Sequence, residues 1–305
     1  MVDSTATRTS LADIATDDGT FAIIAMDQRN TLKRMYAAVG VADPTDAELV
    51  GAKADVVSAL RQSASAFLLD PTYGIPALAE LDDSGPMPGI LVAAEPSARD
   101  SWEGEPRATR DPQQDAAWVR AQGGHAVKFL IQLRAGRPVG DGPDLSAEAL
   151  QVVGEVIADC REQGIPSVIE NLIYDLPGQH LSGREREDVI IESARQLDQL
   201  GPDLLKLEYP GSPHACRRLA GAVTAPWAVL SAGVAFDEFS HVLQVSCDEG
   251  GASGFIAGRA VWKDVVGMSR PDRQAYLVDE GQRRLDGCLA AISGRARPWT
   301  EVTGS

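Results

Sequence analysis

Residues 201–211, GPDLLKLEYPG, place a lysine in an otherwise apolar run. Side chains of a strand point to alternate faces, so Lys206 and Glu208 share one face and the neighbouring leucines take the other. A charged amine among leucines is costly to bury, which favours the neutral, nucleophilic form of the amine. The stretch therefore predicts a buried strand whose lysine forms a Schiff base with a carbonyl compound.

A second interpretation of the same stretch stays open. A lysine near the end of an exposed strand can extend its long side chain into solvent, or it can pair with Glu208 on its own face. The amine would then be an ordinary surface charge. The burial of Lys206 decides between these two interpretations.

Seven other short apolar segments surround this one, and helical patterns or loops separate them. Strands that alternate with helices are typical of a parallel sheet covered by helices, and eight strands close a (β/α)8 TIM barrel. A doubly wound open sheet is the alternative, but no GxGxxG follows the first strand. The predicted strands besides the opening one are residues 20–26, 66–69, 89–94, 126–133, 166–170, 227–230 and 254–257.

We expect one barrel domain over residues 1–305, with a core at about 20–267, a C-terminal helix at 271–293 and a polar tail at 294–305. A barrel of this length is common, because insertions often extend a core of about 250 residues. Loop 96–111 is charged, contains a tryptophan and is a candidate lid. Helices are predicted between the strands, among them 112–122, 145–161 with Ser146 as its N-cap, and 184–200.

Amino-acid composition and net charge exclude some classes of function. Hydrophobic residues make up 44% and charged residues 24% of the chain, as in ordinary globular proteins. The 28 basic and 44 acidic residues give a net charge of −16, which opposes binding to nucleic acids and anionic membranes. The sequence has no apolar N-terminal segment and no apolar run of about 18 residues. We therefore expect a cytoplasmic enzyme with a small-molecule substrate.

Metal and disulfide chemistry are not expected. The histidines lack the spacing of metal ligands, and the cysteines form no CxxC pair. We expect buried or free thiols, no metal and no cofactor. The four cysteines are Cys160, Cys216, Cys247 and Cys288.

Polar residues gather in or just after the C-terminal halves of the predicted strands. In a TIM barrel these ends form the catalytic face, and the last two loops commonly hold a phosphate. The residues concerned are Asp27, Asp70, Glu95, Lys128, Glu170, Lys206, Ser231 and Arg259. A single catalytic face at the strand ends is therefore predicted.

Two strand lysines with neighbouring carboxylates suit Schiff-base chemistry. Lys206 would attack the carbonyl, while Lys128 polarises the substrate and Glu170 moves protons. A structural ion pair between Lys128 and Glu170 is the alternative. Backbone N–H groups and a guanidinium at Gly233, Gly258 and Arg259 would hold an anion, although Arg259 could equally form a surface salt bridge.

Six segments, in order over about residues 20–267, resemble the class I aldolases that cleave tagatose 1,6-bisphosphate and, in a close branch, sulfofructose 1-phosphate. The last segment is nearest to the sulfofructosephosphate branch. They are 21–35 (FAIIAMDQRNTLKRM), 125–133 (HAVKFLIQL), 168–175 (VIENLIYD), 203–210 (DLLKLEYP), 230–234 (LSAGV) and 251–262 (GASGFIAGRAVW).

The resemblance implies a metal-independent (β/α)8 barrel, with Lys206 as the Schiff-base lysine, that forms a homo-oligomer. The substrate would be 6-deoxy-6-sulfofructose 1-phosphate, cleaved to dihydroxyacetone phosphate and sulfolactaldehyde; a tagatose or fructose 1,6-bisphosphate would give glyceraldehyde 3-phosphate instead. It also implies that Asp27, Gln28, Lys128 and Glu170 line the site, and that Ser231, Gly233, Gly258 and Arg259 surround the 1-phosphate.

The sequence departs from this family at two places. Residues 132–134 read Gln-Leu-Arg where tagatose enzymes tend to carry aromatic and acidic residues, and loop 96–111 does not align. Either could form the far end of the substrate pocket. Arg134 or Arg107 would suit a sulfonate or phosphate there, or could be a surface charge.

Two other functions remain open. The barrel could bind a sugar phosphate without turning it over, although a binding protein gains nothing from a desolvated amine. It could also keep the Schiff base and cleave another substrate, such as a deoxysugar phosphate or an intermediate of inositol breakdown.

Overall fold

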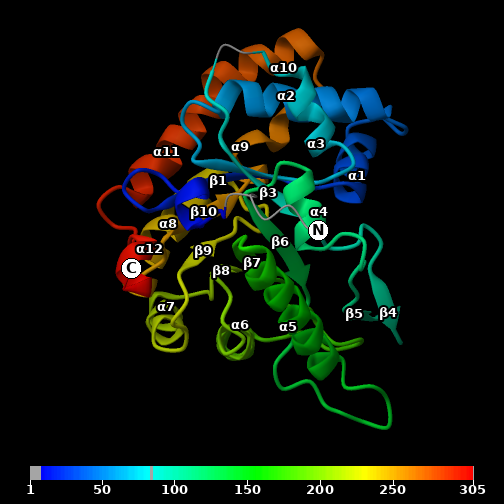
Figure 1. Ribbon diagram of the computed structural model, residues 1–305, viewed down its shortest axis with the longest axis vertical. Coiled ribbons are helices and arrows are strands. Elements are labelled where there is room, and N and C mark those ends of the chain that lie inside the picture. Colours follow the sequence, from blue (N-terminus) through cyan, green and yellow to red (C-terminus); the bar gives the residue numbers. More distant parts are fainter. Residues whose placement is uncertain (1–7, 83–84, 305) are drawn as a thin grey trace, which may run out of the picture.

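Eight parallel strands form a closed barrel in the computed structural model, which describes residues 8–82 and 85–304 (Figure 1). Their order around the barrel is β1-β10-β9-β8-β7-β6-β3-β2. The predicted (β/α)8 barrel is confirmed, and the open-sheet alternative is wrong. The strands are β1 Phe21–Met26, β2 Ala66–Leu69, β3 Gly89–Ala93, β6 Ala126–Ile131, β7 Ser167–Asn171, β8 Leu204–Leu207, β9 Trp227–Val229 and β10 Gly254–Ala257.

The barrel closes where the first strand pairs with the last. Phe21 lies opposite Gly254, and the pairing continues to Ile24 opposite Ala257. Gly254 has a φ of +131°, and a Cβ there would lie 2.1 Å from the carbonyl oxygen of Phe21. Only glycine permits this close approach of two backbones.

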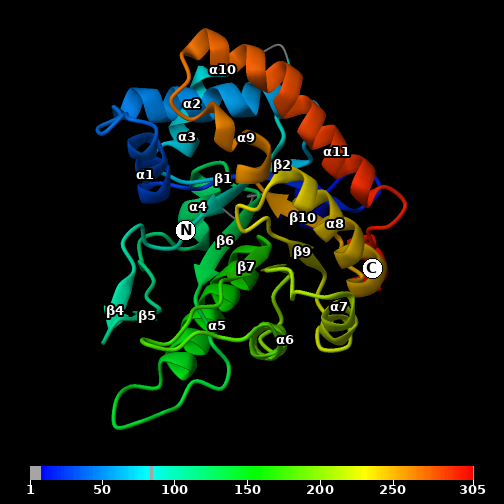
Figure 2. The same ribbon diagram turned by 180° about the vertical axis from the view of Figure 1, so that it is seen from behind.

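Helices cover the outside of the barrel (Figures 1 and 2). The predicted helices are present with somewhat different ends. The unpredicted helices include α1 Asn30–Ala38, α7 Pro213–Ala220 and several single-turn helices such as α3 Gly74–Ala77. No helix within residues 8–82 and 85–304 is long and apolar enough to cross a membrane. The other main helices are α2 Asp46–Leu60, α4 Ala116–Ala121, α5 Leu145–Gln163, α6 Gly183–Asp198 and α8 Phe236–Gly250.

The predicted N-cap of α5 is wrong. Asp144 caps this helix, since its Oδ1 accepts a hydrogen bond of 3.0 Å from the backbone N–H of Ala147. Ser146 lies two positions later, and its hydroxyl donates to the carbonyl oxygen of Arg134 at 3.0 Å. Both residue types are good caps, so composition alone did not separate them.

The C-terminal region is more divided than the sequence suggested. The predicted helix at 271–293 consists of α10 Arg270–Tyr276, a π-helical turn Leu277–Gly281 and α11 Gln282–Ile292. The predicted polar tail contains a short helix, α12 Trp299–Thr303, and Trp299 donates its backbone N–H to Gly19. The first seven residues of the polar start and residue 305 of the tail lie outside the described residues.

Loop 96–111, the candidate lid, carries a hairpin of β4 Asp100–Trp102 and β5 Glu105–Arg107. Glu105 is buried and forms two hydrogen bonds, of 2.7 and 2.8 Å, with the guanidinium of Arg137. Its Oε2 also accepts the Tyr174 hydroxyl at 3.0 Å. The second strand of the hairpin is therefore anchored to the barrel.

We expect the close approach at Gly254 to be essential for stability. Gly254→Ala should lower the free energy of unfolding by about 3 kcal/mol or more, because the new Cβ would clash in a backbone conformation that L residues avoid. Gly154→Ala in α5 is the control, because no atom lies within 4 Å of the added Cβ. It should raise the free energy by about 0.5–1 kcal/mol. Similar urea midpoints for both variants would contradict this account.

Candidate active site

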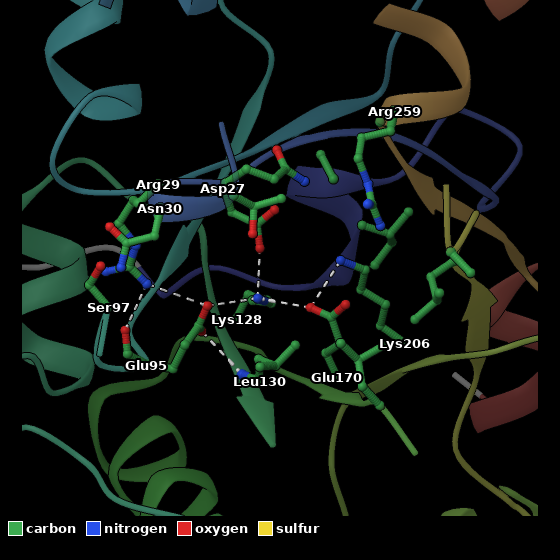
Figure 3. A pocket seen from close by; sticks show the side chains of 18 of the residues that line it. Asp27, Arg29, Asn30, Glu95, Ser97, Lys128, Leu130, Glu170, Lys206 and Arg259 are labelled. Atoms are coloured by element: carbon green, nitrogen blue, oxygen red, sulfur yellow. Dashed lines mark hydrogen bonds and ion pairs between the residues drawn. The ribbon is translucent and has the colours of Figure 1, made fainter. Parts of the chain in front are cut away.

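The alternation of side chains along the strands builds the site. In β1, Phe21, Ile23 and Ala25 face the barrel interior, so the next residue of the same parity, Asp27, also points inward. The same alternation holds in three other strands, where an inward-facing residue is followed two positions later by a polar one. These pairs are Ala126 and Lys128, Val168 and Glu170, and Leu204 and Lys206. The four predicted catalytic residues thus meet at the C-terminal mouth of the barrel (Figure 3).

Lys128 lies at the centre of three carboxylates. Its Nζ is 2.7 Å from Asp27 Oδ2, 2.8 Å from Glu95 Oε1 and 2.8 Å from Glu170 Oε2, and its side chain is only 1% exposed. Burial alone would lower the pKa of this amine, yet the three carboxylates raise it well above its ordinary value. Lys128 is therefore a permanent ammonium group.

Asp27 is held as a carboxylate by the same arrangement. Burial alone would raise the pKa of Asp27, but the neighbouring lysines, Lys128 foremost, lower it well below its usual range. Asp27 is thus a fixed negative charge beside Lys128.

Lys206 is buried, with 4% of its surface exposed. Its Nζ lies 3.0 Å from Glu170 Oε2, the one carboxylate oxygen within ion-pair distance among residues 8–82 and 85–304. Glu208 does not pair with it, because the chain leaves β8 at Leu207. Instead, Glu208 binds Arg186 and accepts the backbone N–H of Ile173 at 3.0 Å. The interpretation of Lys206 as an exposed or Glu208-paired lysine is wrong.

A cavity of about 510 Å³ opens above these residues. Gly233 is not part of its wall; instead it lies directly against the guanidinium of Arg259, which a Cβ at Gly233 would approach to 3.1 Å. The other predicted site residues line the cavity: Asp27, Gln28, Lys128, Glu170, Lys206, Ser231, Gly258 and Arg259.

Gly258 brings the backbone of β10 very close to β1. A Cβ at Gly258 would lie 1.9 Å from the carbonyl oxygen of Ala25, which also accepts the indole N–H of Trp262 at 3.0 Å. The short helix α9 Arg259–Trp262 begins immediately afterwards and carries the Arg259 side chain toward Lys206 (Figure 3). This end of the cavity is therefore basic and has a tightly fixed backbone.

Two residues at the opposite end were not among the predicted site residues. Glu95 binds Lys128 and accepts the backbone N–H of Leu130 at 3.1 Å, and Arg29 donates to the carbonyl oxygen of Glu95 at 3.0 Å. Strand parity could have identified Glu95, which follows the inward-facing Leu91 and Ala93. Arg29 had no such signal, because it lies in the turn before α1. The cavity wall here also includes Ser97, Arg34 and Arg99.

The two arginines predicted for the far end do not line this cavity. Arg107 forms hydrogen bonds of 2.7 and 2.9 Å with Glu148 on α5. Arg134 is buried and donates to the carbonyl oxygen of Tyr174 at 3.1 Å. Both guanidinium groups hold loops in place, and the assignment of Arg134 to the substrate pocket is wrong. Arg107 lines a small hollow that shares Glu95 and Arg99 with the cavity, so its assignment to the far end stays a prediction.

The three carboxylates at Lys128 share an ammonium group. Within residues 8–82 and 85–304, no three His, Cys, Asp or Glu side chains are placed to hold a metal ion together. The four cysteines are buried and unpaired. The cavity is lined by amines, carboxylates and guanidinium groups, together with the hydroxyl groups of Thr31, Ser97 and Ser231.

A model of the DeoC/LacD family of aldolases matches residues 21–264. This chain belongs to that family. It is therefore an aldolase, a carbon–carbon lyase, and the resemblance seen in the sequence is confirmed.

Curated relatives cover almost the whole aldolase chain. Tagatose 1,6-diphosphate aldolase 2 of Enterococcus faecalis is 27% identical over 94% of this chain and 93% of its own. Tagatose 1,6-diphosphate aldolase 1 of Streptococcus mutans is 26% identical over 96% and 98%.

Solved structures share the fold of this aldolase. An archaeal fructose 1,6-bisphosphate aldolase has a TM-score of 0.62 at 17% identity, over 92% of this chain and 96% of its own. The fructose-bisphosphate aldolase of Plasmodium falciparum has a TM-score of 0.70 at 13% identity, over 94% of each chain.

The lowered pKa of Asp27 predicts how its contribution to stability depends on pH. A carboxyl whose folded pKa lies below the unfolded value of about 3.9 stabilises the protein above that pH, and this stabilisation is lost as the pH falls toward the folded pKa. Asp27→Asn should therefore be less stable than the wild type by about 2 kcal/mol at pH 7. The difference should shrink below about pH 4. Urea unfolding at several pH values measures it, and a difference that grows toward acid would contradict the assignment.

Proposed function

We propose that this aldolase is a class I enzyme that forms a Schiff base between Lys206 and a ketose 1-phosphate. The observation that carries this proposal is the position of Glu170 Oε2, which lies 2.8 Å from Lys128 Nζ and 3.0 Å from Lys206 Nζ. A carboxylate between two buried amines can hold one as an ammonium and exchange protons with the other. Schiff-base formation needs an amine that attacks the carbonyl carbon and a group that exchanges protons with it.

The partners of the two lysines support Lys206 as the nucleophile. Lys128 has three carboxylate partners, and the raised pKa of its amine keeps it protonated. Lys206 has Glu170 alone, and this carboxylate, which it shares with Lys128, lies close enough to take a proton from it. An amine must be neutral to attack a carbonyl carbon, so the reaction is assigned to Lys206.

The chemistry then follows from the contacts of Glu170. Glu170 first takes a proton from the Lys206 ammonium, and the neutral amine then adds to the ketone. The protonated Glu170 gives this proton to the departing hydroxyl group, which leaves as water and forms an iminium ion. The Glu170 carboxylate accepts the proton of the hydroxyl group on the carbon that becomes the aldehyde, and the electrons of the broken carbon–carbon bond pass into the iminium. This releases the aldehyde and leaves an enamine, which the protonated Glu170 can protonate. Protonation and hydrolysis of the enamine release dihydroxyacetone phosphate and regenerate the amine. The Glu170 carboxylate stabilises the iminium, while Asp27 and Lys128 supply fixed charges.

The two ends of the cavity support a substrate that is anionic at both ends. We propose that Arg259, Ser231 and the backbone at Gly258 hold the 1-phosphate near Lys206, while Gly233 packs against the Arg259 guanidinium outside the cavity wall. Gln28 Oε1 is buried without a hydrogen-bond partner among the described residues, so it can accept a substrate hydroxyl group. Arg29, with Ser97, Arg34 and Arg99, would receive the distal group.

We propose 6-deoxy-6-sulfofructose 1-phosphate as the first candidate substrate, with sulfolactaldehyde as the aldehyde product. The support is the sequence likeness of residues 251–262 and the departure of residues 132–134 from the tagatose enzymes. A tagatose or fructose 1,6-bisphosphate is the second candidate, in line with the names of the curated relatives. Homo-oligomerisation and a cytoplasmic location stay predictions.

Removal of the Lys206 amine should abolish cleavage. Lys206→Met keeps most of the side-chain volume, and Lys128 remains as the partner of Glu170, so the variant should fold. We expect kcat to fall by at least about 10,000-fold, because the nucleophile is lost. The control is Lys263→Met, outside the cavity, which should keep wild-type activity. An active Lys206→Met enzyme would contradict the proposed mechanism.

A substrate comparison tests the distal end. The enzyme should cleave sulfofructose 1-phosphate with a higher kcat/KM than tagatose or fructose 1,6-bisphosphate. Arg29→Met should lower kcat/KM at least about tenfold for these three substrates, which carry an anionic group at both ends. The loss should be much smaller for fructose 1-phosphate, which lacks the distal anion. Uniform loss with all four would show that Arg29 does not contact the distal group. A barrel that binds these compounds without cleaving any of them would favour the non-catalytic alternative.

A further inference from the structure

A further buried charged group lies behind the active site, outside the cavity. Lys53 on α2 has no exposed surface, in a segment where every residue from Gly51 to Val57 is buried. Burial of an ammonium is costly unless it is paired and hydrogen-bonded. Its three N–H donors are satisfied by three acceptors: the carbonyl oxygen of Met26, that of Gln28 at 2.9 Å, and Asp70 Oδ1.

The two carbonyl groups belong to the residues on either side of Asp27. Beyond Met26, β1 has no further strand partner, since its pairing with β2 ends at Met26 opposite Leu69 and its pairing with β10 ends at Ile24. The turn that carries Asp27 and Gln28 is thus outside the hydrogen bonds of the barrel. The Lys53 ammonium binds two carbonyl groups of this turn from the side away from the cavity.

Asp70 anchors Lys53 in turn. It follows β2 directly, and it accepts backbone N–H groups from Thr72 at 3.0 Å, Tyr73 at 2.9 Å and Gly74 at 3.2 Å. Its carboxylate is therefore fixed by its own turn. Lys53 thus connects the hydrogen-bonded Asp70 turn at the end of β2 to the unpaired residues that follow β1.

We propose that Lys53 is a positioning residue of the aldol reaction, which holds the Asp27–Gln28 turn so that Asp27 meets Lys128 and Gln28 faces the cavity. Lys53 itself does not line the cavity. It acts through the carbonyl groups on both sides of Asp27, and this inference rests on the proposed function. A misplacement of about 1 Å at such a site can cost roughly 100-fold in rate.

Lys53→Met tests the proposal, and Asp55→Asn is the matched control. Asp55 is buried two residues further along α2, where it pairs with Arg270 and Arg273 on α10, away from the cavity. Both variants remove a buried charge from one helix, so both should lower the urea midpoint. Lys53→Met should also lower kcat per folded molecule roughly 10- to 100-fold, while Asp55→Asn should change kcat less than twofold. Equal kcat values for the two variants would overturn the proposal.

A double-mutant cycle identifies the route of the effect. If Lys53 acts through Asp27, Lys53→Met should lower kcat in an Asp27→Asn background by clearly less than in the wild type. The full loss in both backgrounds would overturn the proposal. Lys53→Met/Asp70→Asn, which removes both charges of the buried pair, is the second variant if Lys53→Met does not fold. Failure of both to fold would assign Lys53 to folding alone and would also overturn it.

A crystal structure of the folded Lys53→Met variant tests the proposal without any measurement of catalysis. We expect Asp27 Oδ2 to move out of hydrogen-bond distance of Lys128 Nζ, and an unchanged contact would overturn the proposal. A wild-type enzyme that cleaves no ketose phosphate would refute the proposed function. The distance from Asp27 Oδ2 to Lys128 Nζ in the variant would still show whether Lys53 positions the Asp27–Gln28 turn.

Discussion

Glu170 is the residue on which the rest of the site depends, because one of its oxygens faces both buried lysines. A carboxylate in this place lets two amines lie close together in a buried site, where two positive charges without it would repel each other strongly. Asp27 and Glu95 then divide the lysines into two kinds. Lys128 gains enough negative charge to remain an ammonium, and Lys206 is left with a single shared partner. In the proposed mechanism, this difference in surroundings makes Lys206 the nucleophile and Lys128 the fixed charge.

A few residues on neighbouring strands of the barrel are enough to build this arrangement. Lys128, Glu170 and Lys206 lie on β6, β7 and β8, which are neighbours in the sheet, and Glu170 lies directly opposite Lys206 in the register. Each follows an apolar inward-facing residue two positions earlier. Asp27 reaches the same centre from β1, beyond its last strand pairing, and this is the position where Lys53 and Asp70 add support from outside.

Much of the fold and the centre of the site could be predicted from the sequence, because both depend on local patterns. The eight strands are short apolar runs, and the period of two along each strand sets which polar residues share the lumen. The same rule includes Glu95, which was noted at a strand end without a role. The N-cap of α5 was misassigned because two suitable residues, Asp144 and Ser146, lie close together.

Long-range pairing could not be predicted in this way. Arg107 and Arg134 looked suitable for a distal anion, yet their partners Glu148 and Tyr174 depend on how the hairpin and the loop after β7 fold back. Lys53 lies on a helix that is buried on all sides of its middle turns, since α10 and α11 cover its outer face. No periodic pattern distinguishes such a lysine from a solvated one.

The most direct test of the central claim is chemical trapping of the Schiff base. The enzyme is incubated with dihydroxyacetone phosphate and sodium borohydride, and the modified residue is located by peptide mass spectrometry among the five lysines, Lys33, Lys53, Lys128, Lys206 and Lys263. The different surroundings of the two active-site amines predict a single adduct on Lys206. An adduct on Lys128, or none on either lysine, would contradict the account.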